Sequence, residues 1–239
     1  SKRNSLMSEA KVYLLPMLLH EEGWDSIPAD IVKWIQQCDA FFVENEKTTR
    51  RYFKKLWREM VIEDYTWCAI HKVEAEQINT FKDLLKAGKN IGIISEAGCA
   101  GVADPGQILV GIAQEMGVTV KPYVGPNSIL LALMASGMNG QLFQFHGYLP
   151  IDALERKKKI QTLEQDMRSR TCTQIFIETP YRNDQLLDAI LQSCNATTKI
   201  CIGVDITGPN EWIKTGTVDY WKKNKPELHK KLAVFLIGQ

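Results

Sequence analysis

Two glycine-rich bends carry the residue types best suited to hold a small ligand. The first runs from Glu96 to Gly106 and contains Gly98 and Gly101, and the second runs from Gly125 to Ser128. Glycines and other small residues let the backbone approach a ligand closely. Each bend also opens a predicted helix, whose first N–H groups are free to bind polar or anionic ligand atoms. Neither bend matches G-x-G-x-x-G or G-x-x-x-x-G-K-[ST], which disfavours a Rossmann dinucleotide site and a P-loop.

Two consecutive predicted strands must position these bends. Residues 90–95 form an Ile-rich apolar run, typical of a strand buried on both faces, and residues 118–124 form the next strand. Ligands bind to open α/β sheets outside the carboxyl ends of the strands, so the pattern predicts a ligand site at that edge. The alternative is an ordinary βαβα unit with ordinary turns, because one fold serves many functions.

Helix start and stop signals surround both bends. Asp104 is expected at the N-cap of the first helix, with Pro105 in its first position and Gly117 after its last turn. The second helix is expected over residues 129–136, with Gly137 as its stop signal.

The rest of the chain continues the alternation of strands and helices. Further strands are predicted over residues 11–15, 40–44, 65–70, 141–148, 171–178, 199–205, 212–218 and 231–238. Further helices are predicted over residues 26–37, 47–59, 73–87, 152–170 and 179–194. This pattern predicts an α/β protein with two α/β domains, residues 11–124 and 125–239.

Composition places the chain among ordinary globular proteins. The 239 residues are 45% hydrophobic and 24% charged, with a net charge of +1 that gives no strong nucleic-acid signature. No apolar run is long enough for a transmembrane helix, and the polar first ten residues contain no apolar signal core. The six cysteines include no C-x-x-C pair, so we expect reduced thiols in a cytoplasmic protein, with no disulfide framework, no metal site and no membrane attachment.

Four segments, in order, resemble motifs of one family. Residues 95–106 are similar to S-D-A-G-x-P-x-x-S-D-P-G, and residues 125–137 are similar to P-G-P-S-A-x-x-x-A-L-x-x-S-G. Residues 145–150 resemble F-x-G-F-L-P, and residues 176–182 resemble F-Y-E-S-P-H-R. These are motifs of the tetrapyrrole methylase superfamily, the class III S-adenosylmethionine-dependent methyltransferases. Their order and spacing are similar to those of the bacterial branch that 2′-O-methylates a cytidine in small-subunit ribosomal RNA.

The resemblance implies a fold, a cofactor and a set of binding residues. In this family S-adenosylmethionine lies in the cleft between two α/β domains, the enzymes are usually homodimers, and the branch named above acts on RNA. Carried over by motif position, the cofactor-binding residues expected here are Glu96, Gly98, Cys99, Gly101, Val102, Ser128, Ala132, Tyr181, Thr207 and Gly208.

The chain departs from the family pattern in four places near the expected site. The family's A-E-D-T-R-x-T resembles residues 44–50, but the Asp-Thr-Arg portion is altered, so only Glu44 is carried over. The family's T-P-I-G-N-L loop reads here as residues 16–23, without the early glycine. Glu96 stands where the family has Asp, and Gly208 stands where it has Lys in E-L-T-K. These departures leave two alternatives open: a methyltransferase of a tetrapyrrole or other small molecule, and a cofactor-binding protein that has lost catalysis.

The candidate catalytic residues follow from position. A ribose hydroxyl needs a base or a nearby cation to lower the cost of deprotonation. Glu44, Lys47 and His71 are the candidates, with Glu46 and Arg50 as further possibilities by position. A single histidine at a strand end is also compatible with a purely structural role.

A basic helix follows Glu44 in the sequence. Its cations are Lys47, Arg50, Arg51, Lys54, Lys55 and Arg58. One interpretation is a solvated helix face, and the other is a surface that contacts phosphates near the ligand site. The aromatic residues Tyr52, Phe53 and Trp57 fall at helical spacing and are expected in the core.

Overall fold

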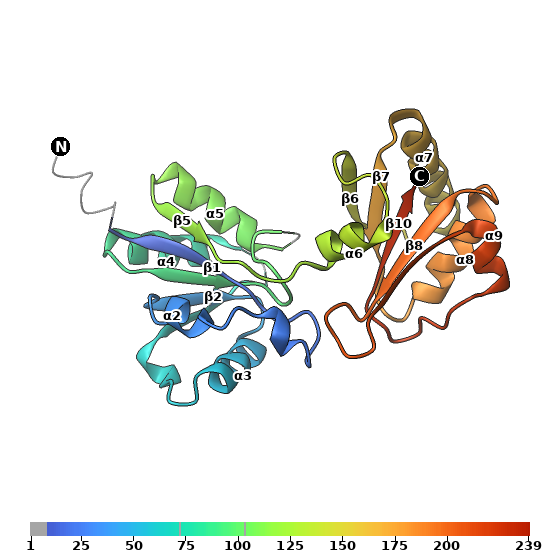
Figure 1. The fold of residues 1–239 in the computed structure, drawn as a ribbon. Coiled ribbons are helices and arrows are strands. Elements are labelled where there is room, and N and C mark those ends of the chain that lie inside the picture. The colour runs from blue at the N-terminus through green and yellow to red at the C-terminus, as the bar shows by residue number, and fades with distance from the viewer. Residues whose placement is uncertain (1–8, 72, 103) are drawn as a thin grey trace. The chain divides into compact units, whose positions relative to one another are not determined.

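The computed structural model describes residues 9–71, 73–102 and 104–239 (Figure 1). The chain divides into two compact units, of which the first ends at Pro126 and the second runs from Asn127 to Gln239. We call them the N-terminal and the C-terminal unit. Ala103, in the first glycine-rich bend, lies outside the described residues.

The N-terminal unit is built on a parallel sheet. Its strands are β1 (Lys11–Leu15), β2 (Ala40–Val43), β3 (Thr66–Ala69), β4 (Ile91–Ile94) and β5 (Thr119–Pro122). They lie in the order β3-β2-β4-β1-β5, and every neighbouring pair is parallel. All five carboxyl ends therefore point to the same edge, which is where this type of sheet places its ligand sites.

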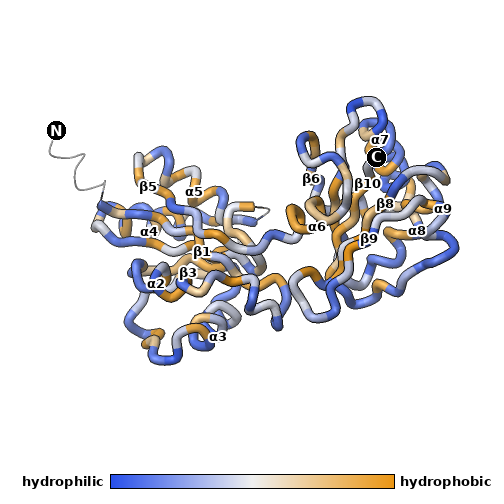
Figure 2. The backbone as a smooth tube through the Cα atoms, viewed as in Figure 1, coloured by the Kyte–Doolittle hydropathy of each residue, from blue (hydrophilic) through white to orange (hydrophobic). Residues whose placement is uncertain are grey.

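Helices cover both faces of this sheet because its central strands are apolar on both sides (Figure 2). The helices are α2 (Ile31–Ile35), α3 (Glu46–Leu56), α4 (Ala75–Lys86) and α5 (Gly106–Glu115). One core contains Phe42 and Ile93 with residues of α4 and α5, and the other contains Phe41 and Ile94 with residues of α2 and α3. Short 3-10 helices, Trp24–Ser26 and Ile62–Asp64, complete the unit.

The C-terminal unit contains a mixed sheet. Its strands are β6 (Phe143–Tyr148), β7 (Thr173–Ile177), β8 (Lys199–Val204), β9 (Trp212–Thr217) and β10 (Ala233–Gly238), in the order β6-β7-β10-β8-β9. β6 and β7 are parallel, whereas β10 and β9 run against their neighbours. The carboxyl ends of β7 and β8 thus share an edge with the beginnings of β9 and β10.

The helices of the C-terminal unit are α6 (Ser128–Ser136), α7 (Ala153–Arg170), α8 (Asn183–Ser193) and α9 (Val218–Lys223). α7, α8 and α9 pack their apolar residues on one core with the sheet. α6 contacts β8, β9 and β10. The predicted α/β class is confirmed for both units.

Three sequence-based expectations for the helices are wrong. Only residues 31–35 of the helix expected over 26–37 are α-helical, because Ile27 precedes Pro28 and is extended. The helix expected from Thr179 begins at Asn183, after a turn. The first-bend helix begins at Gly106, with Pro105 rather than Asp104 at the N-cap.

No helix within the described ranges is both long and apolar enough to cross a membrane. All six cysteines are free thiols.

Candidate functional site

The loops after β1, β4 and β5 meet at the carboxyl edge of the N-terminal sheet. Met17 and Gly98 form an isolated bridge, with the Met17 N–H donating to the Gly98 carbonyl at 2.9 Å and the Gly98 N–H donating to the Met17 carbonyl at 3.1 Å. Gly98 has a φ of +72°, and a Cβ atom there would lie 3.0 Å from the Pro126 carbonyl oxygen. A Cβ atom on Gly125 would lie only 2.2 Å from the Cβ atom of Pro16. Both glycines therefore permit a close approach of loops that no larger residue allows.

An apolar cavity of about 350 Å³ opens at this edge. Its lining residues are Leu14, Leu15, Pro16, Cys99, Ala100, Gly101, Val102, Gln107, Val110, Pro122 and Tyr123. The Cys99 thiol lies 3.3 Å from the Pro126 carbonyl oxygen, to which it donates. Burial raises the pKa of Cys99, which keeps the thiol protonated and favours this donor role.

Asp104 fixes the shape of the first bend. Its carboxylate accepts the Gly101 N–H at 2.8 Å and the Gly106 N–H at 2.7 Å. Burial raises the pKa of Asp104, and the backbone N–H groups around it partly offset this effect. Although Asp104 is not the N-cap residue, its carboxylate still binds the N–H groups at the start of α5.

Glu44 lies at the same edge, directly after β2, and is half-buried. Burial raises the pKa of its carboxyl, a backbone N–H of Glu96 lowers it, and the charges of Asp104 and Glu96 raise it further. The charge of His71, an exposed residue just after β3, lowers it. Glu44 is therefore a carboxyl group whose pKa lies above its ordinary value, so its carboxylate form is more basic than an ordinary one.

Lys47 lies in the first turn of α3 and is exposed. The neighbouring Arg50 forms an ion pair with Glu46, and its guanidinium lies 5.1 Å from the centre of the Trp67 ring. Arg50 and Glu46 are thus engaged with each other, whereas no ion pair involves Glu44, Lys47 or His71 within the part of the chain that the structure describes.

Five of the residues predicted to bind a cofactor lie in the C-terminal unit. Ser128 is the first residue of α6, and the buried Ala132 lies on the same helix. Thr207 and Gly208 lie in the loop between β8 and β9, and the exposed Tyr181 lies in the turn after β7. The turn follows β7 and the loop follows β8, and the carboxyl ends of these two strands lie at the same edge of the sheet.

The β8–β9 loop presents an unpaired polar atom. The Thr207 hydroxyl is buried and has no hydrogen-bond partner within the described part of the chain. The Thr207 backbone has a φ of +73°, and its N–H donates to the Glu211 carboxylate at 2.9 Å. A left-handed β-branched residue is strained, and strain of this kind concentrates at binding sites. The Thr207 hydroxyl is therefore a candidate group for binding a ligand at this loop.

Sequence reasoning missed several residues at the edge of the N-terminal sheet. Tyr123 lines the cavity but belongs to no motif, and Pro16 also lines it but was noted only as the start of the loop of residues 16–23 that departs from the family pattern. The available signal was position: Pro16 directly follows the strand predicted over residues 11–15, and Tyr123 lies near the end of the strand predicted over 118–124. Among the described residues no group of three or more His, Cys, Asp or Glu side chains could hold a metal ion.

Two curated proteins to which the chain is similar share one name. A search of protein-family models finds no match to the chain. The chain is 32% identical over 203 residues to ribosomal RNA small subunit methyltransferase I of Vibrio cholerae, covering 85% of this chain and 67% of that protein. It is 36% identical over 134 residues to the protein of the same name from Mesorhizobium japonicum, covering 56% of this chain and 44% of the relative. The match thus spans less than half of the second relative's length.

Solved structures show the same fold. The methyltransferase CobJ superimposes with a TM-score of 0.61 at 15% identity, covering 97% of this chain and 94% of that one. Uroporphyrin-III-C-methyltransferase from Thermus thermophilus gives a TM-score of 0.57 at 14% identity, covering 96% of this chain and 92% of that one. At this identity the likeness concerns the fold alone.

Proposed function

This chain belongs to the family of ribosomal RNA small subunit methyltransferase I, within the tetrapyrrole methylase superfamily, and we propose that it methylates small-subunit ribosomal RNA. The methyl donor in this proposal is S-adenosylmethionine. One structural observation carries the proposal. The two glycine-rich bends meet at Gly98 and Pro126, beside an apolar cavity and near a half-buried carboxyl.

The residues present fit such a cofactor. The N-terminal unit offers an apolar cavity flanked by the backbone of Gly98, Cys99, Gly101 and Val102, which suits a ligand with apolar and polar parts. The C-terminal unit offers the unpaired Thr207 hydroxyl. We assign cofactor binding to the residues expected from the sequence: Glu96, Gly98, Cys99, Gly101, Val102, Ser128, Ala132, Tyr181, Thr207 and Gly208. When bound, S-adenosylmethionine supplies an electrophilic methyl group, so the protein has to orient the acceptor.

We assign to Glu44 the role of general base. A ribose hydroxyl attacks well only when its proton is removed, and a carboxyl with a raised pKa is a better base than an ordinary one. Burial gives Glu44 this property. His71 acts on Glu44 through its charge, and the exposed Lys47 is the cation available to stabilise a developing alkoxide.

The ribose 2′-hydroxyl of a cytidine is the acceptor in this proposal. The family resemblance supports that atom, and the names of both relatives support small-subunit ribosomal RNA as the substrate. The likeness to enzymes that act on tetrapyrroles concerns the fold and does not favour that substrate class.

We further propose that the protein acts as a homodimer in the cytoplasm. Exposed apolar side chains of the C-terminal unit support dimerisation, because an exposed group of this kind is typical of an interface. They are Leu130, Met134, Tyr148, Ile151 and Leu154. Size-exclusion chromatography with light scattering measures the oligomeric state directly.

A methyl-transfer assay tests the function. The purified chain is incubated with S-adenosylmethionine carrying a tritiated methyl group and with small ribosomal subunits, free ribosomal RNA or a tetrapyrrole in separate reactions. We expect label in the RNA of the first two reactions. Label in the tetrapyrrole alone would overturn the RNA assignment, and cofactor binding without any transfer would indicate a protein that has lost catalysis.

A further inference from the structure

A second groove opens beside the candidate site of the N-terminal unit, with a volume of about 260 Å³. It is lined by Met17, Leu18, Glu21, Trp24, Thr48, Arg51, Tyr52, Lys55 and Glu96. We propose that this groove, which we call the Trp24 groove, binds one nucleotide of single-stranded RNA. Trp24 would stack on the base, and Arg51 and Lys55 would contact phosphates. The inference rests on the proposed function and adds a binding site to it.

The cations of α3 divide into engaged and available groups. Arg50 is paired with Glu46, and the Lys54 ammonium donates to the carbonyl oxygens of Arg58 and Met60 at 2.6 and 2.9 Å. Within the described residues, neither Arg51 nor Lys55 forms an ion pair with a carboxylate.

Arg51 and Lys55 are one helical turn apart and both exposed, so they lie on the same side of α3. Thr48, the third α3 residue in the groove with an exposed side chain, adds a hydroxyl to that side. Two adjacent cations and a hydroxyl form the kind of surface that contacts a phosphate backbone.

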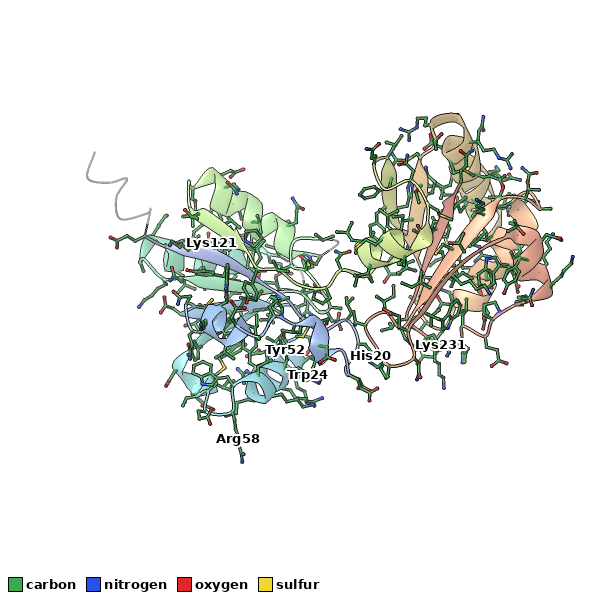
Figure 3. The ribbon with its side chains drawn as sticks, viewed as in Figure 1. His20, Trp24, Tyr52, Arg58, Lys121 and Lys231 are labelled. Atoms are coloured by element: carbon green, nitrogen blue, oxygen red, sulfur yellow. The ribbon has the colours of Figure 1, made fainter. Side chains whose placement is uncertain are left out.

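An aromatic platform lies next to these cations. The Trp24 and Tyr52 rings, both labelled in Figure 3, are stacked with centroids 5.8 Å apart and planes inclined by 26°. Tyr52 is buried and its hydroxyl donates to the Pro16 carbonyl at 2.8 Å. This hydrogen bond fixes the ring on which Trp24 stacks. The Lys55 ammonium lies 5.8 Å from the Trp24 ring centre. Aromatic rings beside cations are the usual means of binding unpaired bases.

The groove also contains two carboxylates, Glu21 and Glu96. A groove with cations on the helix side and carboxylates on the loop side is not suited to a purely anionic partner. Carboxylates accept hydrogen bonds from base amino groups and ribose hydroxyls. A nucleotide can therefore contact the cations through its phosphate and the carboxylates through its base or ribose. Glu96 also lies beside Glu44, which places the groove next to the proposed base.

The sequence of this chain explains why the groove exists here. Trp24 follows the loop of residues 16–23 that departs from the family pattern, and the short helix Trp24–Ser26 holds it at the edge of the sheet. Three hydrogen bonds fix that helix. The Ser26 hydroxyl and the Ser26 N–H donate to the Gly23 carbonyl, and the Ile27 N–H donates to the Trp24 carbonyl.

Binding of a fluorescent single-stranded RNA oligonucleotide to the full chain tests the inference. The variants are the double substitution Arg51→Gln with Lys55→Gln, and Trp24→Ala with Trp24→Phe as the conservative partner. We expect Trp24→Ala to weaken binding about tenfold, as removal of one base stack does, and Trp24→Phe to restore most of it. The double variant should weaken binding and make the salt dependence shallower, by about 0.7 in log–log slope for each phosphate that the protein no longer neutralises.

The matched control is Lys86→Gln with Lys89→Gln, which removes the same charge from exposed positions of the same unit outside the groove. It should leave the affinity and the salt slope nearly unchanged. Equal losses of affinity in the groove and control variants would overturn the inference, as would unchanged affinity in the groove variants. A fluorescent acidic peptide serves as a second probe. If the groove variants weaken peptide binding as much as RNA binding, the inference is overturned, because the groove would then recognise negative charge alone.

Calorimetric titration with S-adenosylmethionine separates this inference from the proposed function. The groove variants should bind the cofactor as the wild type does. In the methyl-transfer assay they should raise the KM for small ribosomal subunits more than they lower kcat. Absence of transfer by the wild type would contradict the function, whereas normal transfer with an unchanged KM in the groove variants would contradict only the groove.

Discussion

The two sheets differ in the chemistry that their candidate site edges offer. In the N-terminal unit five parallel strands end together, and the edge holds two carboxyl groups, Glu44 and Asp104, whose pKa values burial raises. In the C-terminal unit the sheet is mixed, and the corresponding edge holds the neutral, unpaired hydroxyl of Thr207. The C-terminal edge also carries a carboxylate, Glu178, but this group is buried and paired with Arg182. We therefore assign proton transfer to the N-terminal unit in the proposed function, and a hydrogen bond to the ligand to Thr207.

The two carboxyl groups of the N-terminal edge differ from each other as well. Asp104 accepts two backbone N–H groups within hydrogen-bond distance, so its oxygens hold the first bend in shape. Glu44 is surrounded by the charges of Asp104, Glu96 and His71. Burial raises the pKa of both groups, but only Glu44 is free to act on a ligand.

Substitution of Glu44 should give the largest effect. Glu44→Gln removes the proposed base, so we expect methyl transfer to fall by about 10² to 10⁴-fold while cofactor affinity stays unchanged. Label transfer and calorimetric titration measure the two quantities. Glu63→Gln, at an exposed position of the same unit, is the control and should retain full activity.

The wild-type rate should also depend on the protonation of Glu44. A base works only when deprotonated, and the pKa of Glu44 lies above its ordinary value, so activity should rise with pH through that raised pKa. A transfer rate that is already at its plateau below the ordinary glutamate value of about 4.3 would exclude Glu44 as the base.

The close approach of the two bends gives the next largest effect. Gly98→Ala adds a left-handed alanine, at a cost of about 1–2 kcal/mol, and places a Cβ atom against the Pro126 carbonyl, at a cost of about 1–3 kcal/mol more. Gly137→Ala shares the positive φ, at +73°, but a Cβ atom there meets nothing within 4 Å. We therefore expect Gly98→Ala to destabilise the protein more and to weaken cofactor binding, as measured by urea unfolding and titration. Equal effects on stability would show that the bends do not constrain each other.

The contrast between the two carboxyl groups should appear in stability. A raised pKa means that the folded protein holds the proton more tightly than the unfolded chain does. The free energy of unfolding therefore falls as the pH rises from the ordinary carboxyl values, about 3.9 to 4.3, through the raised values. Glu44→Gln should remove the part of this pH-dependent decrease that Glu44 causes. The free energy of unfolding at neutral pH should then be unchanged or higher than that of the wild type.

Asp104→Asn should instead lower stability by about 1–2 kcal/mol at neutral pH, because one backbone N–H loses its acceptor. Urea unfolding at several pH values distinguishes the two substitutions. The same decrease in stability for both would mean that Glu44 also has a structural role.

The smallest effect is expected in the C-terminal unit. Thr207→Val removes a hydroxyl that makes no bond in the described part of the chain, so stability should be unchanged while cofactor affinity falls by about five- to tenfold. Thr215→Val is the matched control, because its hydroxyl donates to the Ser136 carbonyl at 2.7 Å. The control should lose about 1 kcal/mol of stability and keep its cofactor affinity. Unchanged cofactor affinity in Thr207→Val, together with lower cofactor affinity in Thr215→Val, would show that Thr207 does not belong to the proposed site.

Local sequence signals were sufficient for most of the framework. The strand expected over residues 11–15 is β1, and the helix expected over 129–136 is α6 with Gly137 in the left-handed conformation after it. The helix expected over 26–37 was wrong because a proline in an apolar pattern imposed extended backbone on Ile27. The six-residue α9 was missed because it begins directly after β9, with Thr217 as its N-cap.

The candidate site was less accessible from the sequence. The bends themselves were visible as small-residue runs, but the contact of Gly125 with Pro16 joins loops over 100 residues apart, and no local pattern encodes it. Similarly, Arg51 and Lys55 belonged to a basic helix whose available cations could be identified only after Arg50 and Lys54 were seen to be engaged. Long-range packing of loops accounts for the first case. The second depends on which side-chain conformations the cations of one helix adopt, and a single sequence does not reveal those either.

Nucleoside analysis of the reaction product is the most direct test. Small ribosomal subunits that lack the modification are incubated with the purified chain and S-adenosylmethionine, and their RNA is digested and examined by mass spectrometry. A ribose-methylated cytidine that disappears with Glu44→Gln is the expected product. Methylation of a base instead of a ribose, or the same product at the same rate from the Glu44 variant, would contradict the mechanism.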